Sequence, residues 1–206
     1  MLALSDLCGC VMHGRDLEVG RVEDVYLDDQ TWRVRHLVVD TRHWLRGRRV
    51  LIPPAAVASA DTERRRVEVA LTRVQVEHSP PIDTAKPVSR QHEIDLYQYF
   101  GFPYDWNGPA IRLGNLRRAD PHLRSGQALT RCRVETPGGL MGPIADVLLD
   151  VDAWTMRYLV VRSPHGAPER AALVAAEWVV AVDWSARAIA VDPHQQAVLQ
   201  TSGYEQ

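Results

Sequence analysis

The sequence predicts a mainly β protein made of two tandem small β-barrels, joined by a linker that contains one short helix. Three observations lead to this prediction: an internal repeat at a fixed shift of 122 residues, short strands in each copy, and a proline pair that excludes a helix. The predicted segments are a first repeat over 1–78, an aromatic linker over 79–125, a second repeat over 126–197 and a tail over 198–206.

The repeat is the strongest signal in the chain. Residues 20–40 (GRVEDVYLDDQTWRVRHLVVD) align without a gap with residues 142–162 (GPIADVLLDVDAWTMRYLVVR), and ten of the 21 positions are identical. The same shift pairs Cys10 with Cys132 upstream and continues downstream to Val191. Each copy therefore spans about 70 residues, which is too long for a solenoid unit and typical of a small domain.

The first long strand of each copy contains an irregularity and ends in a turn. The period-2 pattern slips between Val22 and Val25, and it slips in the same way between Ile144 and Val147, which predicts a β-bulge in each copy. An aspartate at the start of a turn accepts backbone N–H groups. We therefore favour a structural role over a metal-binding or proton-carrying one for the matched residues Gly20, Asp24, Asp28, Gly142, Asp146 and Asp150.

The remaining elements of each copy also read as strands. Residues 33–41 are rich in β-branched residues and carry apolar side chains on both faces, which predicts a strand covered on both sides. Residues 171–181 alone resemble a buried helix, but the aligned residues 50–60 contain Pro53 and Pro54, which a helix interior excludes. We predict two short strands around a tight turn there, and a closed sheet that leaves few exposed edges.

These residues resemble the PRC-barrel family, which is named for the cytoplasmic H subunit of the purple bacterial photosynthetic reaction centre. The resemblance rests on a glycine followed by Val or Ile, the motif D-V-x-L-D, the triplet L-V-V and a later L-I-P-x-x-x-V; it covers 4–71 well and 127–191 less well. The family also includes the C-terminal domain of a ribosome maturation factor and stand-alone proteins. The resemblance implies a binding module without catalytic residues. The two better-known members differ from the predicted organisation of this chain, because the H subunit has a membrane helix and the ribosome factor has a single barrel.

Composition and motifs exclude several classes of function. The chain is 46% hydrophobic and 24% charged with a formal net charge of -2, which argues against affinity based on phosphate neutralisation. The three cysteines lack zinc-site spacing, and the phosphate-loop, dinucleotide and nucleophile-elbow motifs are missing, so we expect no catalytic residues, metal or cofactor. Without a signal peptide or an apolar run of about 18 residues, the expected location is cytoplasmic, with peripheral contact to the inner membrane left open.

The linker contains a cluster of aromatic residues. Ser89 is a suitable N-cap and Gly101 a suitable stop, so we predict a helix from Arg90 to Phe100. The aromatic side chains either pack across the two copies, which we favour, or form a docking patch for a partner protein. The candidates for partner contact are Tyr97, Tyr99, Phe100, Phe102, Tyr104 and Trp106.

Two basic clusters in the first copy provide a second type of candidate surface. They have little counterpart in the second copy, and acidic neighbours at Glu63 and Glu68 partly neutralise one of them. Solvated loop tips are the more common explanation for such clusters. The candidates for RNA or lipid head-group contact are Arg42, Arg46, Arg48, Arg49, Arg64, Arg65 and Arg66.

Three hypotheses of function follow. The first is a non-enzymatic protein-binding or scaffold module, accessory to a membrane complex of electron transport. The second is an RNA or ribosome-assembly factor that uses the basic loops of the first copy. The third is a proton-handling accessory to a quinone site, in which Glu23, Asp24, His36 or His43 relays protons. The first predicts a protein partner, and the sequence leaves its identity and the oligomeric state open.

Overall fold

The computed structural model describes residues 1–45, 48–80, 88, 90–103, 122–162, 171–192 and 199–200. Its described part is mainly β, with separate N-terminal and C-terminal sheets, and this confirms the predicted fold class. Three candidate residues, Arg46, Tyr104 and Trp106, lie outside the described residues. In the part that is described, no helix has the length and apolarity needed to cross a membrane.

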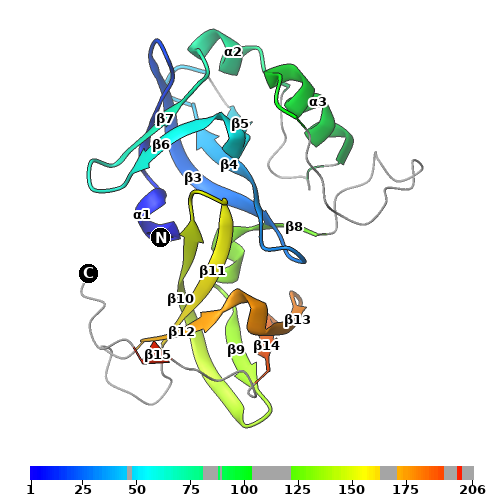
Figure 1. Cartoon of the computed structure of the whole chain (residues 1–206). Helices are drawn as coiled ribbons and strands as arrows, with labels where there is room; N and C mark the ends of the chain where they lie inside the picture. Colours follow the sequence, from blue (N-terminus) through cyan, green and yellow to red (C-terminus); the bar gives the residue numbers. More distant parts are fainter. Residues whose placement is uncertain are drawn as a thin grey trace. The chain divides into compact units, whose positions relative to one another are not determined.

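The N-terminal sheet has seven described strands (Figure 1). They are β2 (Val11–His13), β3 (Glu18–Asp28), β4 (Val34–Asp40), β5 (Arg49–Ile52), β6 (Val57–Asp61), β7 (Arg66–Val69) and β8 (Leu123–Ser125). The strand order is β5-β4-β3-β2-β7-β6, and β8 pairs with β3. The pair β2–β7 is parallel, whereas β2–β3, β4–β5 and β6–β7 are antiparallel.

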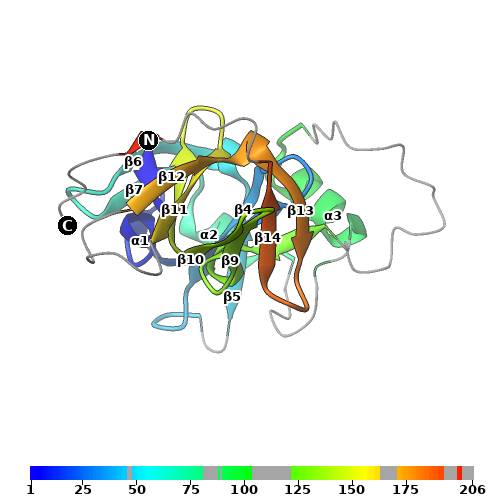
Figure 2. The ribbon, with the colours of Figure 1, turned by 90° about the horizontal axis from the view of Figure 1, so that it is seen from below.

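The C-terminal sheet has eight described strands. They are β1 (Leu2–Ala3), β9 (Arg133–Thr136), β10 (Gly139–Asp150), β11 (Thr155–Arg162), β12 (Ala171–Ala175), β13 (Val179–Asp183), β14 (Ala188–Val191) and β15 (Leu199–Gln200). The order is β13-β14-β9-β10-β11-β12-β15, with β1 paired to β10. Figure 2 shows that the strands of this sheet between β12 and β13 follow a curved path. The long strand β10 keeps the sheet continuous, because it pairs with both β9 and β11.

Helical segments are short in the described residues. They are α1 (Leu4–Leu7), the 3₁₀ turn η1 (Pro54–Ala56), α2 (Arg73–Glu77), α3 (Arg90–Phe100), α4 (Gly126–Leu129) and the 3₁₀ turn η3 (Ala176–Trp178). Helix α3 has the bounds that the sequence predicts. Helix α2 was not predicted, although Thr72 and Gln75 form a capping box at its start. The proline pair starts the single turn η1 between β5 and β6, so the strand–turn–strand prediction is confirmed.

The two sheets follow one strand plan at the spacing of the sequence repeat. Strands β5 and β12, β6 and β13, and β7 and β14 each start 122 residues apart. Among the described residues other than glycine, positive φ angles occur at Trp32 (59°) and Trp154 (47°), and at Arg65 (51°) and Arg187 (53°). Each pair again has the spacing of 122 residues, so the backbone takes the same uncommon turn conformation at aligned positions.

The aspartates at matching positions have structural contacts in both sheets. Asp28 Oδ1 accepts hydrogen bonds from the backbone N–H groups of Gln30 (3.0 Å) and Thr31 (2.9 Å), and Asp150 makes the same kind of turn contacts. Asp24 and Asp146 each accept from the N–H of the next residue. In β10 the pairing register shifts at Asp146, where the sequence predicts a bulge.

Gly20 and Gly142 lie within strands and not in turns. A Cβ atom at Gly20 would lie 2.3 Å from the backbone oxygen of Asp40, closer than any side-chain carbon can approach. Gly142 has a φ of 147°, which side chains rarely allow. The structural role of these glycines is therefore a close approach of backbone segments and an unusual strand geometry, respectively.

The chain divides into two compact units whose boundaries differ from those of the sequence repeats. One unit contains residues 6–26 and 35–123, and the other contains 1–5, 27–34 and 124–206. The second unit thus includes two pieces of the first repeat. Strand β1 pairs with β10, and the tip of the β3–β4 hairpin bonds to the turn before β11, through Val34 N–H and the Trp154 oxygen at 2.7 Å.

The inner faces of both sheets are apolar and closed to solvent. Leu27 and Leu37 of the N-terminal sheet align with Leu149 and Leu159 of the C-terminal sheet, and none of these four leucines has exposed surface. Cys10 and Cys132 are also buried, and burial raises the pKa of both thiols. Both cysteines are therefore small residues of the core.

Candidate helix-docking surface on the N-terminal sheet

Helix α3 packs one face against the N-terminal sheet. Glu93 and Leu96 are fully buried, Phe100 is 8% exposed and Tyr97 is half-buried. Their spacing of three and four residues places them along one side of the helix. The helix ends at Gly101, whose φ of 74° favours glycine and whose N–H donates to the oxygen of Gln98.

The buried carboxylate of Glu93 is the centre of this contact. It forms an ion pair with the Arg35 guanidinium, and its Oε1 lies 2.7 Å from Nε2 of His36. Arg35 and His36 belong to β4, so the helix and the strand are joined by charge as well as by apolar packing. Because a buried charge is costly unless it is paired, Glu93 fixes which face of α3 meets the sheet.

The aromatic ring of Tyr97 extends the contact along β4. Its edge meets the His36 ring at a centroid distance of 5.9 Å and an interplanar angle of 68°. Its hydroxyl donates to the backbone oxygen of Arg35 at 3.1 Å. Tyr97 thus serves both as packing area and as a hydrogen-bond donor, which is typical of tyrosine at an interface.

The electrostatic environment of the site is that of a closed structural contact. His36 is fully buried, and its Nδ1 has no hydrogen-bond partner among the described residues. Burial lowers the pKa of the nearby His92, and its electrostatic interaction with His36 lowers it further. Since Glu93 and His36 are both sealed from solvent, the arrangement suits the fixation of a helix better than the turnover of a substrate.

Sequence reasoning missed Glu93 and Arg35. The available signal was the position of Glu93 in the predicted helix, three and four residues before Leu96 and Tyr97, on the face that carries the large apolar side chains. A carboxylate on such a face predicts a buried cation opposite it. The cation itself could not be identified, because the strand predicted over residues 33–41 contains both Arg33 and Arg35, and nothing in the sequence distinguishes them.

The aromatic candidates for partner contact differ in exposure. Phe100 is buried, Phe102 is partly exposed, and Tyr99 is 41% exposed. The Tyr99 hydroxyl donates to the oxygen of Gln75 in α2 at 2.9 Å, and its ring meets that of Phe100 edge to face. Tyr97 and Tyr99 therefore attach α3 to β4 and α2, and the role of the aromatic residues in partner contact stays a prediction.

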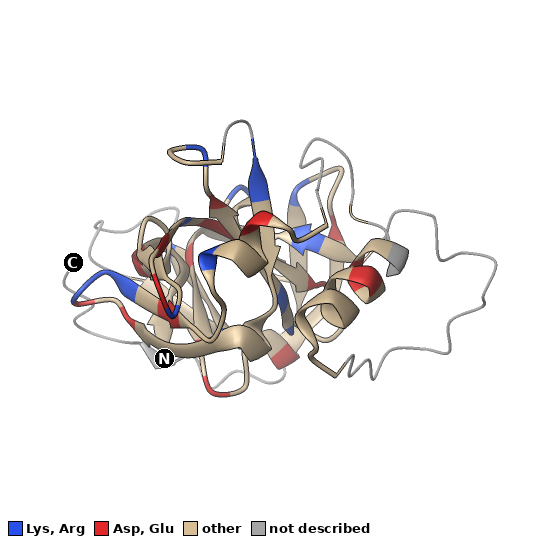
Figure 3. Ribbon diagram, turned by 90° about the horizontal axis from the view of Figure 1, so that it is seen from above, with Lys and Arg blue, Asp and Glu red and all other residues tan. Residues whose placement is uncertain are grey.

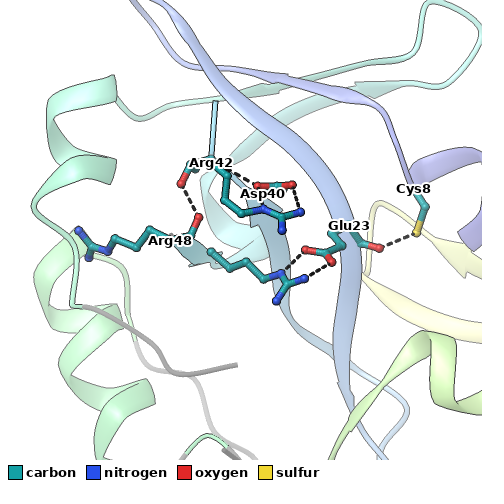
Figure 4. Close-up of polar contacts among 7 residues, drawn as sticks. Cys8, Glu23, Asp40, Arg42 and Arg48 are labelled. Atoms are coloured by element: carbon teal, nitrogen blue, oxygen red, sulfur yellow. Dashed lines mark hydrogen bonds and ion pairs between the residues drawn. The ribbon is translucent and has the colours of Figure 1, made fainter. Parts of the chain in front are cut away.

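The basic candidates on the β4–β5 side are engaged with acidic groups or carbonyl oxygens. Arg42 makes two contacts with the Asp40 carboxylate, at 2.9 and 2.7 Å (Figure 4). These contacts lower the pKa of Asp40 to about 2. Arg49 pairs with Glu23 at 2.6 Å, and Arg48 donates to the backbone oxygens of Glu77 and Ser79.

The second basic cluster lies at the β6–β7 turn and is exposed to solvent. Arg64 lies 3.7 Å from Asp61, Arg66 lies 3.1 Å from Glu68, and Arg65 donates to the backbone oxygen of Cys8 at 3.3 Å. Figure 3 shows Lys and Arg interspersed with Asp and Glu over the described ribbon. Neither cluster therefore presents a run of arginines without acidic neighbours.

The residues proposed as a proton relay lie in different environments. His36 is buried under α3, whereas His43 is exposed, 3.7 Å from Glu18, beside an open hollow that Arg21 and Asp40 also line. Glu23 is engaged by Arg49. Within the described ranges, no group of three or more His, Cys, Asp or Glu side chains is arranged to hold a metal ion.

Comparison with known proteins agrees with this architecture. A search of curated proteins gave no match. The family model described as PRC-barrel domain matches residues 1–76, which include β1 to β7 and most of α2. The resemblance inferred for the first repeat is thereby confirmed, whereas that of residues 127–191 stays a prediction. Residues 1–76 of the chain thus match a PRC-barrel domain, as a member of this family would.

Proposed function

We propose that this chain is a non-enzymatic protein-binding module whose barrels present sheet faces to helices. The observation that carries the proposal is the packing of α3 on the N-terminal sheet, where the buried carboxylate of Glu93 pairs with Arg35 and His36. A PRC-barrel domain fits a module without catalysis. We further propose that residues 126–197 form a second barrel of the same family, and that the partner belongs to a membrane complex.

The state of the arginines favours protein binding over RNA binding. Phosphate recognition depends on cations that are available to replace counterions. Arg42 and Arg49 are held by carboxylates on the protein, and the guanidinium of Arg48 is turned to backbone oxygens. An RNA surface at this place would have to break these contacts first.

A pull-down with the full chain tests the proposal. The bait is incubated with extract of the source cells in mild detergent, with and without nuclease, and retained proteins are quantified against the bait. We expect a partner at a fixed stoichiometric ratio that survives nuclease treatment. Loss of all retained protein after nuclease, with RNA binding that an Arg48→Ala/Arg49→Ala variant weakens, would support the RNA alternative, and no retained macromolecule would contradict the proposal.

A further inference from the structure

The outer face of the C-terminal sheet corresponds, position by position, to the outer face of the N-terminal sheet, where His36 contacts Glu93 and Tyr97 of α3. Six positions on this N-terminal face, in β3, β4 and β5, have aligned residues 122 positions later, in β10, β11 and β12. The pairs are Glu23/Ala145, Tyr26/Leu148, His36/Tyr158, Val38/Val160, Arg49/Ala171 and Leu51/Leu173. These six C-terminal residues, which we call the β10–β12 patch, form one apolar cluster together with Ala3.

The strand registers place the patch on a single face. Leu148 of β10 is directly opposite Tyr158 of β11, and Val160 of β11 is directly opposite Leu173 of β12. In the N-terminal sheet, Val38 and Leu51 are opposite each other in the same way. The patch is therefore the structural equivalent of the N-terminal face that carries His36, and not only its equivalent in the alignment.

The charged groups of the N-terminal face are replaced by apolar ones in the patch. Glu23 and Arg49 form an ion pair at 2.6 Å, and alanine stands at both aligned positions. His36, which contacts the carboxylate of α3, is replaced by Tyr158. The patch has no ionisable group other than the tyrosine hydroxyl, so it suits an occupant that is apolar where α3 is charged.

The patch is also incompletely covered. Leu148 and Val160 are each 6% exposed, but Ala145, Tyr158, Ala171 and Leu173 are all partly exposed. Residues 130–162 and 171–192 contain no helix longer than the three-residue turn η3. Among the described residues, the C-terminal repeat thus lacks an element of its own that corresponds to α3.

We infer that the β10–β12 patch is the docking site for an amphipathic helix of a partner protein. The buried side of this helix carries an apolar residue at the position that Glu93 occupies in α3. This inference rests on the proposed function and specifies its interface. Charge complementarity selects this occupant over α3 of a second copy. Against the patch, Glu93 would face Tyr158 in place of His36, and the aligned cation Arg157 is already bound to Asp150 at 3.2 Å.

A peptide of residues 88–103 provides the probe. It is synthesised with a fluorescent label in two forms, native and Glu93→Leu, and titrated with the full chain by fluorescence anisotropy. We expect the Glu93→Leu peptide to bind at least about tenfold more tightly than the native one, because the native peptide must bury a carboxylate without a cation. Equal affinity of the two peptides would overturn the inference.

Variants of the chain identify the site of binding. Ala145→Glu/Ala171→Arg transfers the N-terminal ion pair to the patch, at partly exposed positions where folding is easily checked by circular dichroism. This variant should lose at least about tenfold in affinity for the Glu93→Leu peptide, since docking would now desolvate two charges. The matched control is Val180→Ala, at a position of β13 that is 66% exposed, outside the patch.

The remaining outcomes separate the occupants. Unchanged peptide affinity in the Ala145→Glu/Ala171→Arg variant overturns the assignment of the site. Sedimentation equilibrium that shows a dimer of the native chain, weakened by the same variant, makes a second copy the occupant and overturns the partner assignment. If the pull-down retains a partner equally well with this variant, the inference fails while the proposed function stands; if the native chain retains none, the proposed function fails.

Discussion

Replacement of Glu93 by alanine tests whether charge holds α3 on the N-terminal sheet. The side chain of Glu93 is 1% exposed, and those of its partners Arg35 and His36 are 11% and 0% exposed. Removal of one member of a buried ion pair costs about 3–5 kcal/mol. We expect about 3 kcal/mol, the lower end of this range, because Arg35 keeps some contact with solvent.

Two measurements distinguish loss of α3 from loss of the whole fold. Urea unfolding followed by circular dichroism gives the free energy of unfolding, and hydrogen exchange gives the protection of the α3 amides. If α3 detaches locally, its amide protection falls more than that of β4. Glu93→Gln keeps an acceptor for His36 but removes the charge, so its effect should be intermediate.

The matched control is Gln98→Ala, which shortens an exposed side chain of similar length in the same helix. Exposed substitutions of this kind change stability by at most about 0.5 kcal/mol. Should Glu93→Ala and Gln98→Ala lower the free energy of unfolding equally, or leave the α3 amides equally protected, the ion pair has no role in docking and the reasoning is refuted.

Three further predictions concern single contacts. Gly20→Ala should lower the free energy of unfolding in urea by about 3 kcal/mol, because its Cβ would meet the backbone oxygen of Asp40. The control Gly138→Ala, whose Cβ would have its nearest atom at 3.6 Å, should leave the stability nearly unchanged. Equal effects of the two substitutions would contradict the close approach at Gly20. The Asp40 carboxyl should titrate near pH 2 by NMR, and Arg42→Ala should raise its pKa toward 3.8. Because the folded pKa is lowered, the stabilisation is present above pH 4 and is lost as the pH falls toward 2; an unmoved titration would disprove the pairing. Asp29→Ala removes an acceptor for Trp184 Nε1 (2.7 Å) and Arg124 Nε (3.1 Å), so it should lower the free energy of unfolding by about 2 kcal/mol and speed proteolysis at the tip of the β3–β4 hairpin. The control Gln30→Ala, at an exposed position of the same tip, should have neither effect. Identical proteolysis rates of the two variants would show that Asp29 does not hold the hairpin tip in place.

Local signals account for the parts of the fold that the sequence predicts correctly. The Asp28 and Asp150 turns, the bulge at Asp146 and the bounds of α3 each depend on residues within a few positions of one another. Their physical causes are backbone preferences and short-range hydrogen bonds, which a single sequence displays directly. The aligned copy resolved the one ambiguous segment, because Pro53 and Pro54 exclude the helix that residues 171–181 alone would suggest.

The parts that the sequence did not predict depend on contacts between distant segments. Strand β1 has only two residues, and nothing in Leu2 or Ala3 indicates that they pair with β10. The contact of Glu93 with Arg35 spans 58 residues, and that of Asp29 with Trp184 spans 155. Such pairings are set by packing in the folded chain, so one sequence gives their residue types but not their partners.

The differences between the two copies are informative because their inner faces are so similar. Leu37 and Leu159, like Val39 and Val161, are identical and buried on the inner side, which explains why both segments form the same sheet. Outer positions do not contribute to this core, so they are free to specify what packs against the sheet. The paired replacement of Glu23 and Arg49 by alanines removes both members of an ion pair and leaves no unmatched charge. One strand plan thus carries a charged outer face in the N-terminal sheet and an apolar outer face in the C-terminal sheet, and we propose that the apolar face accepts a helix different from α3.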